Sequence, residues 1–256
     1  MKDWSPQNYL KFADERSRPA QDLLAQVSLV APRLIYDLGC GPGNSTALLD
    51  RAYPDAEIIG VDNSPAMLSQ ARETLPIRKF MEADIATWMP EPQVDLLFSN
   101  AMFQWVPDHA TVLLRLIKGL MLGAVLAIQM PDNLNEPSHQ LMREVAGDGP
   151  WAERLQPAVT ARSALMSPQS YYELLKPFCA QLDIWHTVYN HALEGAQGIV
   201  DLVSSTGLRP FLNLLAKEQQ TEFLSEYKSR LAKAYPTASD GKVLLRFPRL
   251  FIVAKI

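Results

Sequence analysis

The sequence predicts an α/β fold in which a mostly parallel β-sheet is covered by helices on both faces. Between about residues 20 and 130, short apolar runs alternate with segments of helical period. Parallel strands need crossover connections, and helices that make these connections pack on the two faces of the sheet. A glycine-rich turn after the first apolar run, at residues 39–43, and an acidic residue at the end of the next run, Asp62, support the same class.

The elements of this region are marked by apolar runs and by helix-start residues. One helix is expected after Gly43. Another begins at Ser64, a capping residue that is followed by proline. A third extends from Asp108, a plausible N-cap, to about Leu120. The expected strands are Leu34–Leu38, Glu57–Val61, Arg78–Met81, Val94–Ser99 and Ala124–Gln129.

After Met130 the pattern changes, and a helical lobe is expected before the last strand. About fifty residues, 192–241, separate two expected strands that do not need so long a connection. We therefore expect one domain over residues 1–256, with this lobe over the strand ends and a cover segment at residues 1–19. The remaining expected elements are a helix at Glu136–Ala146, a loop around Gly147–Pro157, a helix from Ser167 and Pro168, strands at Leu182–Asn190 and Arg246–Lys255, and helical periodicity at Glu218–Tyr235.

Composition excludes several classes of protein. The net charge is −4, and the estimated pI is 5.6, which argues against a nucleic-acid binder. The cysteines, Cys40 and Cys179, suggest no disulfide framework. The chain start does not resemble a signal peptide, and the longest apolar stretch is too short for a bilayer. We expect a cytoplasmic protein with neither a membrane nor a nucleic acid as partner.

The segment from residue 34 to residue 43 is the most informative part of the chain. An apolar run ends in Asp37, and Gly39, Gly41 and Gly43 follow at every second position. Glycine lets a backbone turn sharply and approach a ligand closely. Asp62 lies 19 residues beyond Gly43, where a βαβ unit brings a carboxylate to a ribose. These residues predict a site for an adenosine-bearing cofactor.

Ligands of open parallel sheets bind beyond the carboxyl ends of the strands. Asp62 is expected to accept hydrogen bonds from both ribose hydroxyls. Asp84 is expected to accept one from the exocyclic amine of adenine, and the backbone N–H of Ile85 is expected to donate one to the adenine ring. Carbonyls near Gly39 and Ser99 are suited to an ammonium group. Each feature alone has an ordinary explanation, such as a tight turn, a helix cap or a loop carboxylate. Their joint occurrence at successive strand ends favours the cofactor site.

These motifs resemble the S-adenosylmethionine-dependent methyltransferases of the Rossmann-like class, known as class I. The resemblance lies in residues 37–43, 60–67, 83–85 and 95–105. It implies S-adenosylmethionine as the cofactor and S-adenosylhomocysteine as the product. The cofactor-binding residues that it implies are Asp37, Gly39, Cys40, Gly41, Asn44, Asp62, Asn63, Met67, Ala83, Asp84, Ile85 and Asn100.

A narrower resemblance covers nearly the whole chain. Residues 3–19, 129–133, 205–210 and 247–254 are similar to a family of trans-aconitate methyltransferases. This implies methyl transfer to one carboxylate of trans-aconitate, giving the monomethyl ester and S-adenosylhomocysteine. The partner that it implies is accordingly a small tricarboxylate or dicarboxylate. A different small acid, a quinone or an acyl-carrier substrate remains the alternative.

The expected chemistry needs no general base, because a carboxylic acid with a pKa of about 4 is ionised at neutral pH. No catalytic residue and no metal are therefore expected, and Gln104 and Trp105 would orient the reactants. Most of the four histidines are expected at the surface or in strands. Arginine suits the unreacting carboxylates, and Arg16 and Arg246 are further candidates beside the expected substrate-binding residues Tyr9, Arg18, Arg209 and Arg249.

Three rival functions remain open. The glycine spacing is not the G-x-G-x-x-G of dinucleotide binders, which counts against a NAD-dependent oxidoreductase. The segment after Asn100 lacks the prolines of amine-modifying nucleic-acid methyltransferases. A cofactor-binding module without activity is the third rival.

Overall fold

The computed structural model describes the backbone of residues 13–256 and the side chains of residues 17–256. Tyr9 and most of the expected cover segment, residues 1–19, lie outside the described part. The described chain divides into two compact units. We call residues 13–130, 165–187 and 250–256 the sheet unit, and residues 131–164 and 188–249 the helical unit. The expected lobe, residues 192–241, falls within the second of these, and its status as the substrate lobe stays a prediction.

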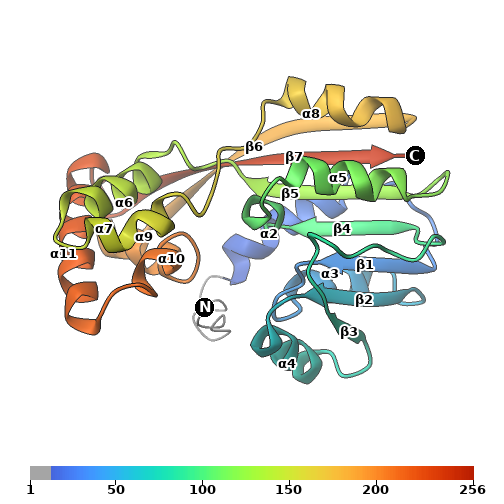
Figure 1. Ribbon diagram of the computed structural model, residues 1–256, viewed down its shortest axis with the longest axis horizontal. Coiled ribbons are helices and arrows are strands. Elements are labelled where there is room, and N and C mark those ends of the chain that lie inside the picture. The colour runs from blue at the N-terminus through green and yellow to red at the C-terminus, as the bar shows by residue number, and fades with distance from the viewer. Residues whose placement is uncertain (1–12) are drawn as a thin grey trace. The chain divides into compact units, whose positions relative to one another are not determined.

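The strands form one seven-stranded sheet in the order β3-β2-β1-β4-β5-β7-β6 (Figure 1). The pairs β3-β2, β2-β1, β1-β4 and β4-β5 are parallel. The N–H of Ile256 donates to the carbonyl of Ala124, and the N–H of Asp132 donates to the carbonyl of Pro248. These backbone hydrogen bonds show that β7 runs antiparallel to β5. The strands are β1 (Leu34–Leu38), β2 (Glu57–Asp62), β3 (Lys79–Glu82), β4 (Leu96–Asn100), β5 (Val125–Pro131), β6 (Gln181–Leu193) and β7 (Val243–Lys255). This is the mostly parallel sheet that the sequence predicts.

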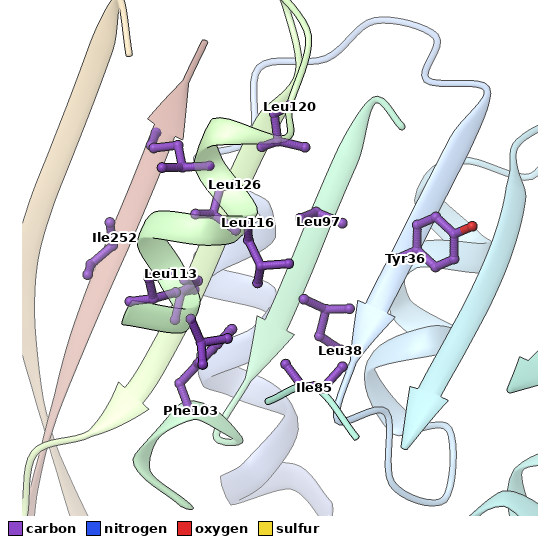
Figure 2. Packing of buried hydrophobic residues seen from close by; sticks show 14 of the residues in the cluster. Tyr36, Leu38, Ile85, Leu97, Phe103, Leu113, Leu116, Leu120, Leu126 and Ile252 are labelled. Atoms are coloured by element: carbon purple, nitrogen blue, oxygen red, sulfur yellow. The ribbon is translucent and has the colours of Figure 1, made fainter. Parts of the chain in front are cut away.

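Helices of the sheet unit pack on both faces of the sheet. In Figure 2, α5 lies in front of the strands, and other helices lie behind them. Contacts pair α2 with α3 and α5 with α8. The helices of this unit are α2 (Ala13–Leu24), α3 (Asn44–Ala52), α4 (Pro65–Thr74), α5 (His109–Lys118) and α8 (Pro168–Leu175), with short 3₁₀ turns η1 (Phe103–Trp105) and η2 (Lys176–Phe178).

The core of the sheet unit lies between α5 and the central strands (Figure 2). Leu113 and Leu116 of α5 are fully buried against Leu97 of β4 and Leu126 of β5. Apolar residues at intervals of three and four place one helix face on the sheet. Burial of such side chains contributes about 25 cal/mol per Å² of apolar surface and dominates the stability of the unit.

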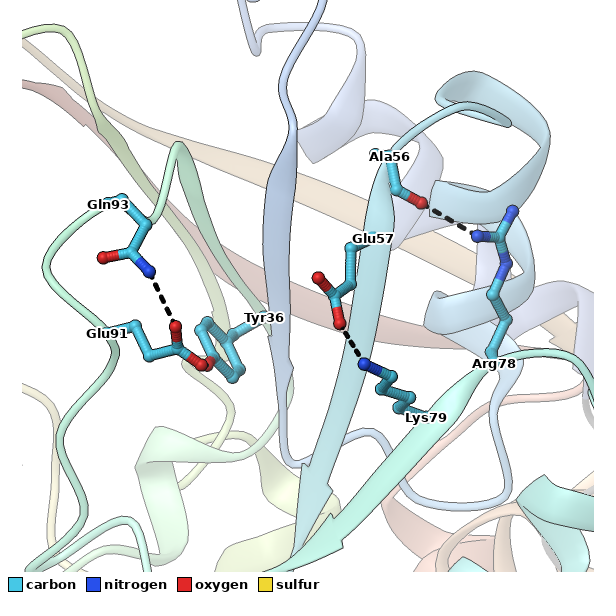
Figure 3. Close-up of polar contacts among 7 residues, drawn as sticks. All are labelled: Tyr36, Ala56, Glu57, Arg78, Lys79, Glu91 and Gln93. Carbon is cyan, nitrogen blue, oxygen red and sulfur yellow. Dashed lines mark hydrogen bonds and ion pairs between the residues drawn. The ribbon is translucent and has the colours of Figure 1, made fainter.

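Polar contacts hold the amino-terminal ends of β2 and β3, opposite to the carboxyl ends of these strands (Figure 3). Glu57 forms an ion pair with Lys79, and Arg78 donates to the carbonyl of Ala56 at 2.8 Å. Tyr36 donates to Glu91 at 3.1 Å. The ion pair is exposed and contributes little to stability. The ion pair lies at the amino-terminal ends of the two strands, so its role is structural.

The helical unit has its own core. It contains α6 (Pro137–Asp148), α7 (Ala152–Val159), α9 (Gly195–Ser204), α10 (Arg209–Leu212) and α11 (Lys217–Ala234). Phe223 of α11 packs edge to face on Trp151, with ring centroids 5.4 Å apart. The hydroxyl of Tyr227 donates to the carbonyl of Ser138 at 2.9 Å, and that of Tyr235 accepts from the Ser138 N–H at 3.0 Å. These contacts fix the start of α6 against α11.

Two expectations about local structure are corrected. The loop expected around Gly147–Pro157 is wrong, because α6 continues to Asp148 and α7 occupies Ala152–Val159. Trp151, Leu155 and Ala158 are buried at helical spacing, and this burial outweighs the bond that Pro157 cannot donate. Asp108 does occupy the N-cap position of α5, but its side chain accepts no capping hydrogen bond. Ser64, in contrast, caps α4 by accepting from the Met67 N–H at 3.3 Å.

Within residues 13–256, none of the helices combines the length and the apolar character that a membrane crossing requires.

Replacing Leu126 by alanine tests the core. Leu126 is fully buried, so the substitution should lower the free energy of unfolding by about 2–5 kcal/mol through lost burial and a residual cavity. Urea denaturation followed by circular dichroism measures this. The matched control is Leu122→Ala, four residues earlier, where the side chain is 92% exposed. Equal effects of the two substitutions would contradict the described core.

Candidate cofactor and substrate site

The turn after β1 is held by the neighbouring strand. The N–H groups of Gly39 and Cys40 both donate to the carbonyl of Val61, at 2.7 and 3.1 Å. Gly39, Gly41 and Gly43 all have positive φ. A Cβ at Gly39 would lie 2.3 Å from the side chain of Met102, so this position requires glycine. At Gly41 a Cβ would meet no heavy atom within 4 Å, which leaves the backbone of this turn open to a ligand.

Asp62 connects this turn to the start of α4. Its Oδ2 accepts from the Gly41 N–H and its Oδ1 from the Ser64 N–H, both at 2.9 Å. The two oxygens of a carboxylate offer about four acceptor positions, so a carboxylate that caps a helix start can also accept from ligand hydroxyls. Asp62 can therefore have two roles, a structural role at the helix start near Ser64 and a role in binding a ligand.

Asp37 is a buried carboxylate at the end of β1. Its Oδ2 accepts from the hydroxyls of Ser45 and Thr46, at 2.7 and 2.6 Å, which ties β1 to the first turn of α3. Its Oδ1 is buried and makes no hydrogen bond to any residue that the structure describes. Burial, with a smaller contribution from the charge of Asp62, raises the pKa of Asp37 to about 6, although the hydrogen bonds from both hydroxyls oppose this shift. A cationic group of a ligand would relieve this cost.

The segment after β3 carries the expected adenine contacts. The N–H of Ala83 donates to the carbonyl of Asp62 at 3.0 Å, which continues the pairing of β3 with β2. Asp84 is exposed, and its Oδ1 accepts from the Ala86 N–H at 2.9 Å. Ile85 is buried in the core of the sheet unit. The segment therefore exposes a carboxylate beside an anchored apolar residue.

Arg115 of α5 anchors the same segment, and sequence reasoning missed it. Its guanidinium donates to the carbonyls of Ile85 at 2.9 Å, Ala86 at 2.6 Å and Trp88 at 3.3 Å. In the sequence this arginine is only a basic residue near the end of an amphipathic helix. The backbone oxygens that it binds lie about thirty positions earlier in the chain, and no local sequence pattern predicts such a contact.

The end of β4 forms the third part of the site. Ala101 has φ 60°, an uncommon value for a residue other than glycine, and its N–H donates to the Gln129 carbonyl at 2.9 Å. Gln104 is buried in η1 and donates to the Ala101 carbonyl at 2.5 Å. Trp105 and Asn100 are half-buried. A strained backbone beside oriented polar groups is typical of a ligand site.

The strand register places these parts together. Parallel pairing of β2 with β1 and β3, and of β1 with β4, brings the carboxyl ends of the four strands to one edge. The other expected cofactor residues accompany them: Asn44 opens α3, Asn63 is exposed before α4, and Met67 is buried in α4. Burial raises the pKa of the Cys40 thiol well above its ordinary value, so this residue is a packing group and not a nucleophile.

The expected substrate residues are distributed over both units. Arg18 is exposed on α2 of the sheet unit. Arg209 opens α10 of the helical unit and is half-buried. Arg249, in β7, is buried, and its guanidinium carbon lies 4.7 Å from the ring centre of Phe247. Arg246 forms an ion pair with Glu136, which gives it a structural role.

His139 departs from the expectation that histidines lie at the surface or in strands. It is buried in α6, and its Nδ1 lies 3.1 Å from the hydroxyl of Ser138. Burial, with smaller contributions from the charges of Arg162 and Arg143, lowers its pKa to about 3. His139 is therefore neutral at physiological pH. Arg143 and Arg162 escaped sequence reasoning because no motif surrounds them.

Asp37→Asn should change the pH dependence of stability. The pKa of Asp37 is raised from 3.8 to about 6 on folding, so its contribution is fully present below pH 3.8 and is lost as the pH rises through 6. The loss amounts to about 3 kcal/mol, from about 1.4 kcal/mol per pKa unit. Urea unfolding from pH 4 to pH 7 should show this decline in the ligand-free wild type and not in the variant. If the free energy of unfolding depends on pH in the same way in the wild type and in the variant, Asp37 does not have a raised pKa.

Comparisons with known proteins agree with this geometry. A family model described as "Methyltransferase domain" matches residues 35–121. The trans-aconitate 2-methyltransferase of Rhodopseudomonas palustris (strain HaA2) is 58% identical over 254 residues and 99% of each chain. That of Afipia carboxidovorans is 57% identical over 253 residues, again 99% of each chain. The crystal structure of the YcgJ protein from Bacillus subtilis has a TM-score of 0.60 at 12% identity, and the match covers 93% of this chain and 97% of that one. The chain therefore belongs to the trans-aconitate 2-methyltransferase family of class I methyltransferases.

Proposed function

We propose that this protein methylates one carboxylate of trans-aconitate with S-adenosylmethionine, giving the monomethyl ester and S-adenosylhomocysteine. The observation that carries the proposal is identity of 57–58% over nearly the full length to relatives named for this activity. The turn after β1, with an open backbone at Gly41 and the carboxylate of Asp62 beside it, supports the choice of cofactor.

The residues of the sheet unit fit this cofactor. The open turn at Gly41 suits the methionine part, and the buried Asp37 supplies a negative charge near the turn for the ammonium group. Asp62 would accept from the ribose hydroxyls. Asp84 and the Ile85 N–H would pair with adenine. When bound, the cofactor supplies a methyl group activated by a positively charged sulfur.

The chain's own part in the reaction is binding and orientation. The substrate carboxylate is ionised at neutral pH and attacks without a general base. Gln104 is fixed by its bond to the Ala101 carbonyl and would orient the reactants together with Trp105. Holding two reactants in line removes on the order of 7–11 kcal/mol of a barrier. Exclusion of water adds to this, because water stabilises the carboxylate more than the charge-dispersed transition state.

Arginines would hold the carboxylates that do not react. A planar guanidinium binds a carboxylate through two parallel hydrogen bonds, which fixes the orientation of the acid. Arg209 and Arg249 of the helical unit, and Arg18 and Tyr9 elsewhere in the chain, are the residues proposed for this role. We also propose a cytoplasmic location, which the two free cysteines support.

A methyl-transfer assay tests the function. Purified protein is incubated with methyl-labelled S-adenosylmethionine and a panel that contains trans-aconitate, cis-aconitate, citrate, fumarate, a fatty acid, a quinone and an acyl-carrier substrate. Label should enter a base-labile ester, with trans-aconitate as the best acceptor, and NMR of the product identifies the esterified carboxylate. Transfer to a quinone or an acyl-carrier substrate in place of every small acid would contradict the proposal.

Arg209→Ala should raise the KM for trans-aconitate by on the order of 10- to 100-fold, as expected for one lost charge-assisted contact. Calorimetry should show the Kd of S-adenosylhomocysteine almost unchanged. The matched control is Arg230→Ala in the same unit, where the guanidinium is paired with Asp148 and Glu226. If both constants change equally in the Arg209 variant, the residue has no specific role toward the substrate.

A further inference from the structure

The segment after β3 forms a tight turn at residues 84–88, which we call the 84–88 turn. The carbonyl of Asp84 accepts from the N–H groups of Thr87 at 3.0 Å and Trp88 at 2.9 Å. The Oδ1 of Asp84 accepts from the Ala86 N–H at 2.9 Å. The first residue of the turn therefore closes it twice, once through its backbone and once through its exposed carboxylate.

Arg115 of α5 binds the 84–88 turn from outside. Its guanidinium donates to the carbonyls of Ile85 at 2.9 Å, Ala86 at 2.6 Å and Trp88 at 3.3 Å. A guanidinium is planar and carries its donors in a fixed arrangement, so three carbonyls bound to it have a defined orientation. Arg115 therefore fixes the orientation of the turn as well as its distance from α5.

Apolar contacts hold the same segment at other points. The side chain of Ile85 is buried in the core of the sheet unit. The ring of Trp88 packs edge to face on Tyr36 of β1, with ring centroids 4.9 Å apart. A Cβ at Gly119 would lie 2.8 Å from the Cε of Met89, so the glycine lets Met89 pack against the end of α5. Loss of the guanidinium should therefore loosen the peptide groups of the turn without unfolding the segment.

One peptide group links Arg115 to the carboxylate of Asp84. The carbonyl of Ile85 accepts from the guanidinium, and the N–H of Ala86, which belongs to the same peptide group, donates to Asp84. A trans peptide group is planar, and its carbonyl and its N–H point in opposite directions. Orienting the carbonyl therefore orients the N–H, and with it the carboxylate.

The preceding peptide group has a donor that points out of the turn. Its carbonyl, that of Asp84, points into the turn, where Thr87 and Trp88 donate to it. Its N–H, that of Ile85, therefore points the opposite way, and among the residues that the structure describes it has no acceptor. The turn thus presents an acceptor and a donor on adjacent residues. Adenine carries the complementary pair on its Watson–Crick edge, an amine that donates and a ring nitrogen that accepts.

We propose that Arg115 is a positioning residue that sets the base preference of the cofactor site. By binding the carbonyls of the 84–88 turn, it fixes the directions of the Asp84 carboxylate and the Ile85 N–H, which together select adenine. This inference rests on the proposed function, which assigns Asp84 and Ile85 to adenine. Hypoxanthine reverses both groups, because a carbonyl replaces the amine and the adjacent ring nitrogen carries a proton. An oriented turn therefore rejects this base, whereas a loosened turn rejects it less.

Arg115→Ala tests the proposal by calorimetric titration of two ligands, S-adenosylhomocysteine and its hypoxanthine analogue, S-inosylhomocysteine. The wild type should bind the adenine ligand on the order of 100-fold more tightly, because the analogue leaves two polar groups unpaired. In Arg115→Ala the Kd of S-adenosylhomocysteine should rise by on the order of tenfold, while that of the analogue changes less than about twofold. Arg115→Lys keeps the charge but not the planar fork, and it should show an intermediate preference.

The matched control is Arg78→Ala. Arg78 also binds backbone carbonyls of the sheet unit, those of Ala56 at 2.8 Å and Pro54 at 3.0 Å, but at the amino-terminal ends of the strands. Its loss should lower the melting temperature and leave the ratio of the two Kd values unchanged. A purely structural role of Arg115 would give the same result as this control.

If Arg115→Ala and Arg115→Lys both keep the wild-type ratio of the two Kd values, the inference is overturned. Circular dichroism shows whether the variants are folded, and the lysine variant alone decides if the alanine variant is not. The titrations need neither trans-aconitate nor methyl transfer. A protein that loses its base preference with Arg115 but does not methylate trans-aconitate would contradict the proposed function and leave this inference standing.

Discussion

The candidate cofactor site depends on one carboxylate, that of Asp62. Its two oxygens accept from the N–H groups of Gly41 and Ser64, so the turn after β1 and the start of α4 are fixed by the same side chain. Hydrogen bonds to an ionised acceptor are about twice as strong as neutral ones. The register of the two strands, with Leu38 opposite Val61, places Asp62 next to the turn. Formation of the site is therefore coupled to pairing of the strands.

Much of the fold could be predicted because its determinants are local. Leu34–Leu38 is a strand with the expected bounds, and the other strands of the parallel part agree within about two residues. The glycine turn was recognisable because positive φ values restrict which residues fit. The expected loop at Gly147–Pro157 was wrong for a tertiary reason. Burial of Trp151 and Leu155 in the helical unit stabilises α7 despite its proline.

The arginines were harder to predict than the acidic residues. An aspartate at the end of a buried strand has its role defined by the position of that strand. Arg115 and Arg162, in contrast, act on backbone carbonyls about thirty positions away, and only the folded chain brings these partners together. Arg143 is distinguished by burial of a nitrogen, which its sequence neighbours do not indicate. Motifs therefore indicated the acidic residues of the candidate cofactor site better than they indicated the contacts of the arginines.

The contacts of Arg162 show how a side chain far along the chain fixes the end of a strand. Its guanidinium donates to the Oδ1 of Asn133 at 2.9 Å and to the carbonyl of Pro131 at 2.5 Å. Burial is the main cause of a pKa lowered to about 10, and the charge of Asp132 opposes this shift. Arg162 therefore stays protonated at neutral pH, and as a charged donor it makes stronger hydrogen bonds than a neutral one. The backbone where β5 ends and the helical unit begins is thus held by a residue about thirty positions later in the chain.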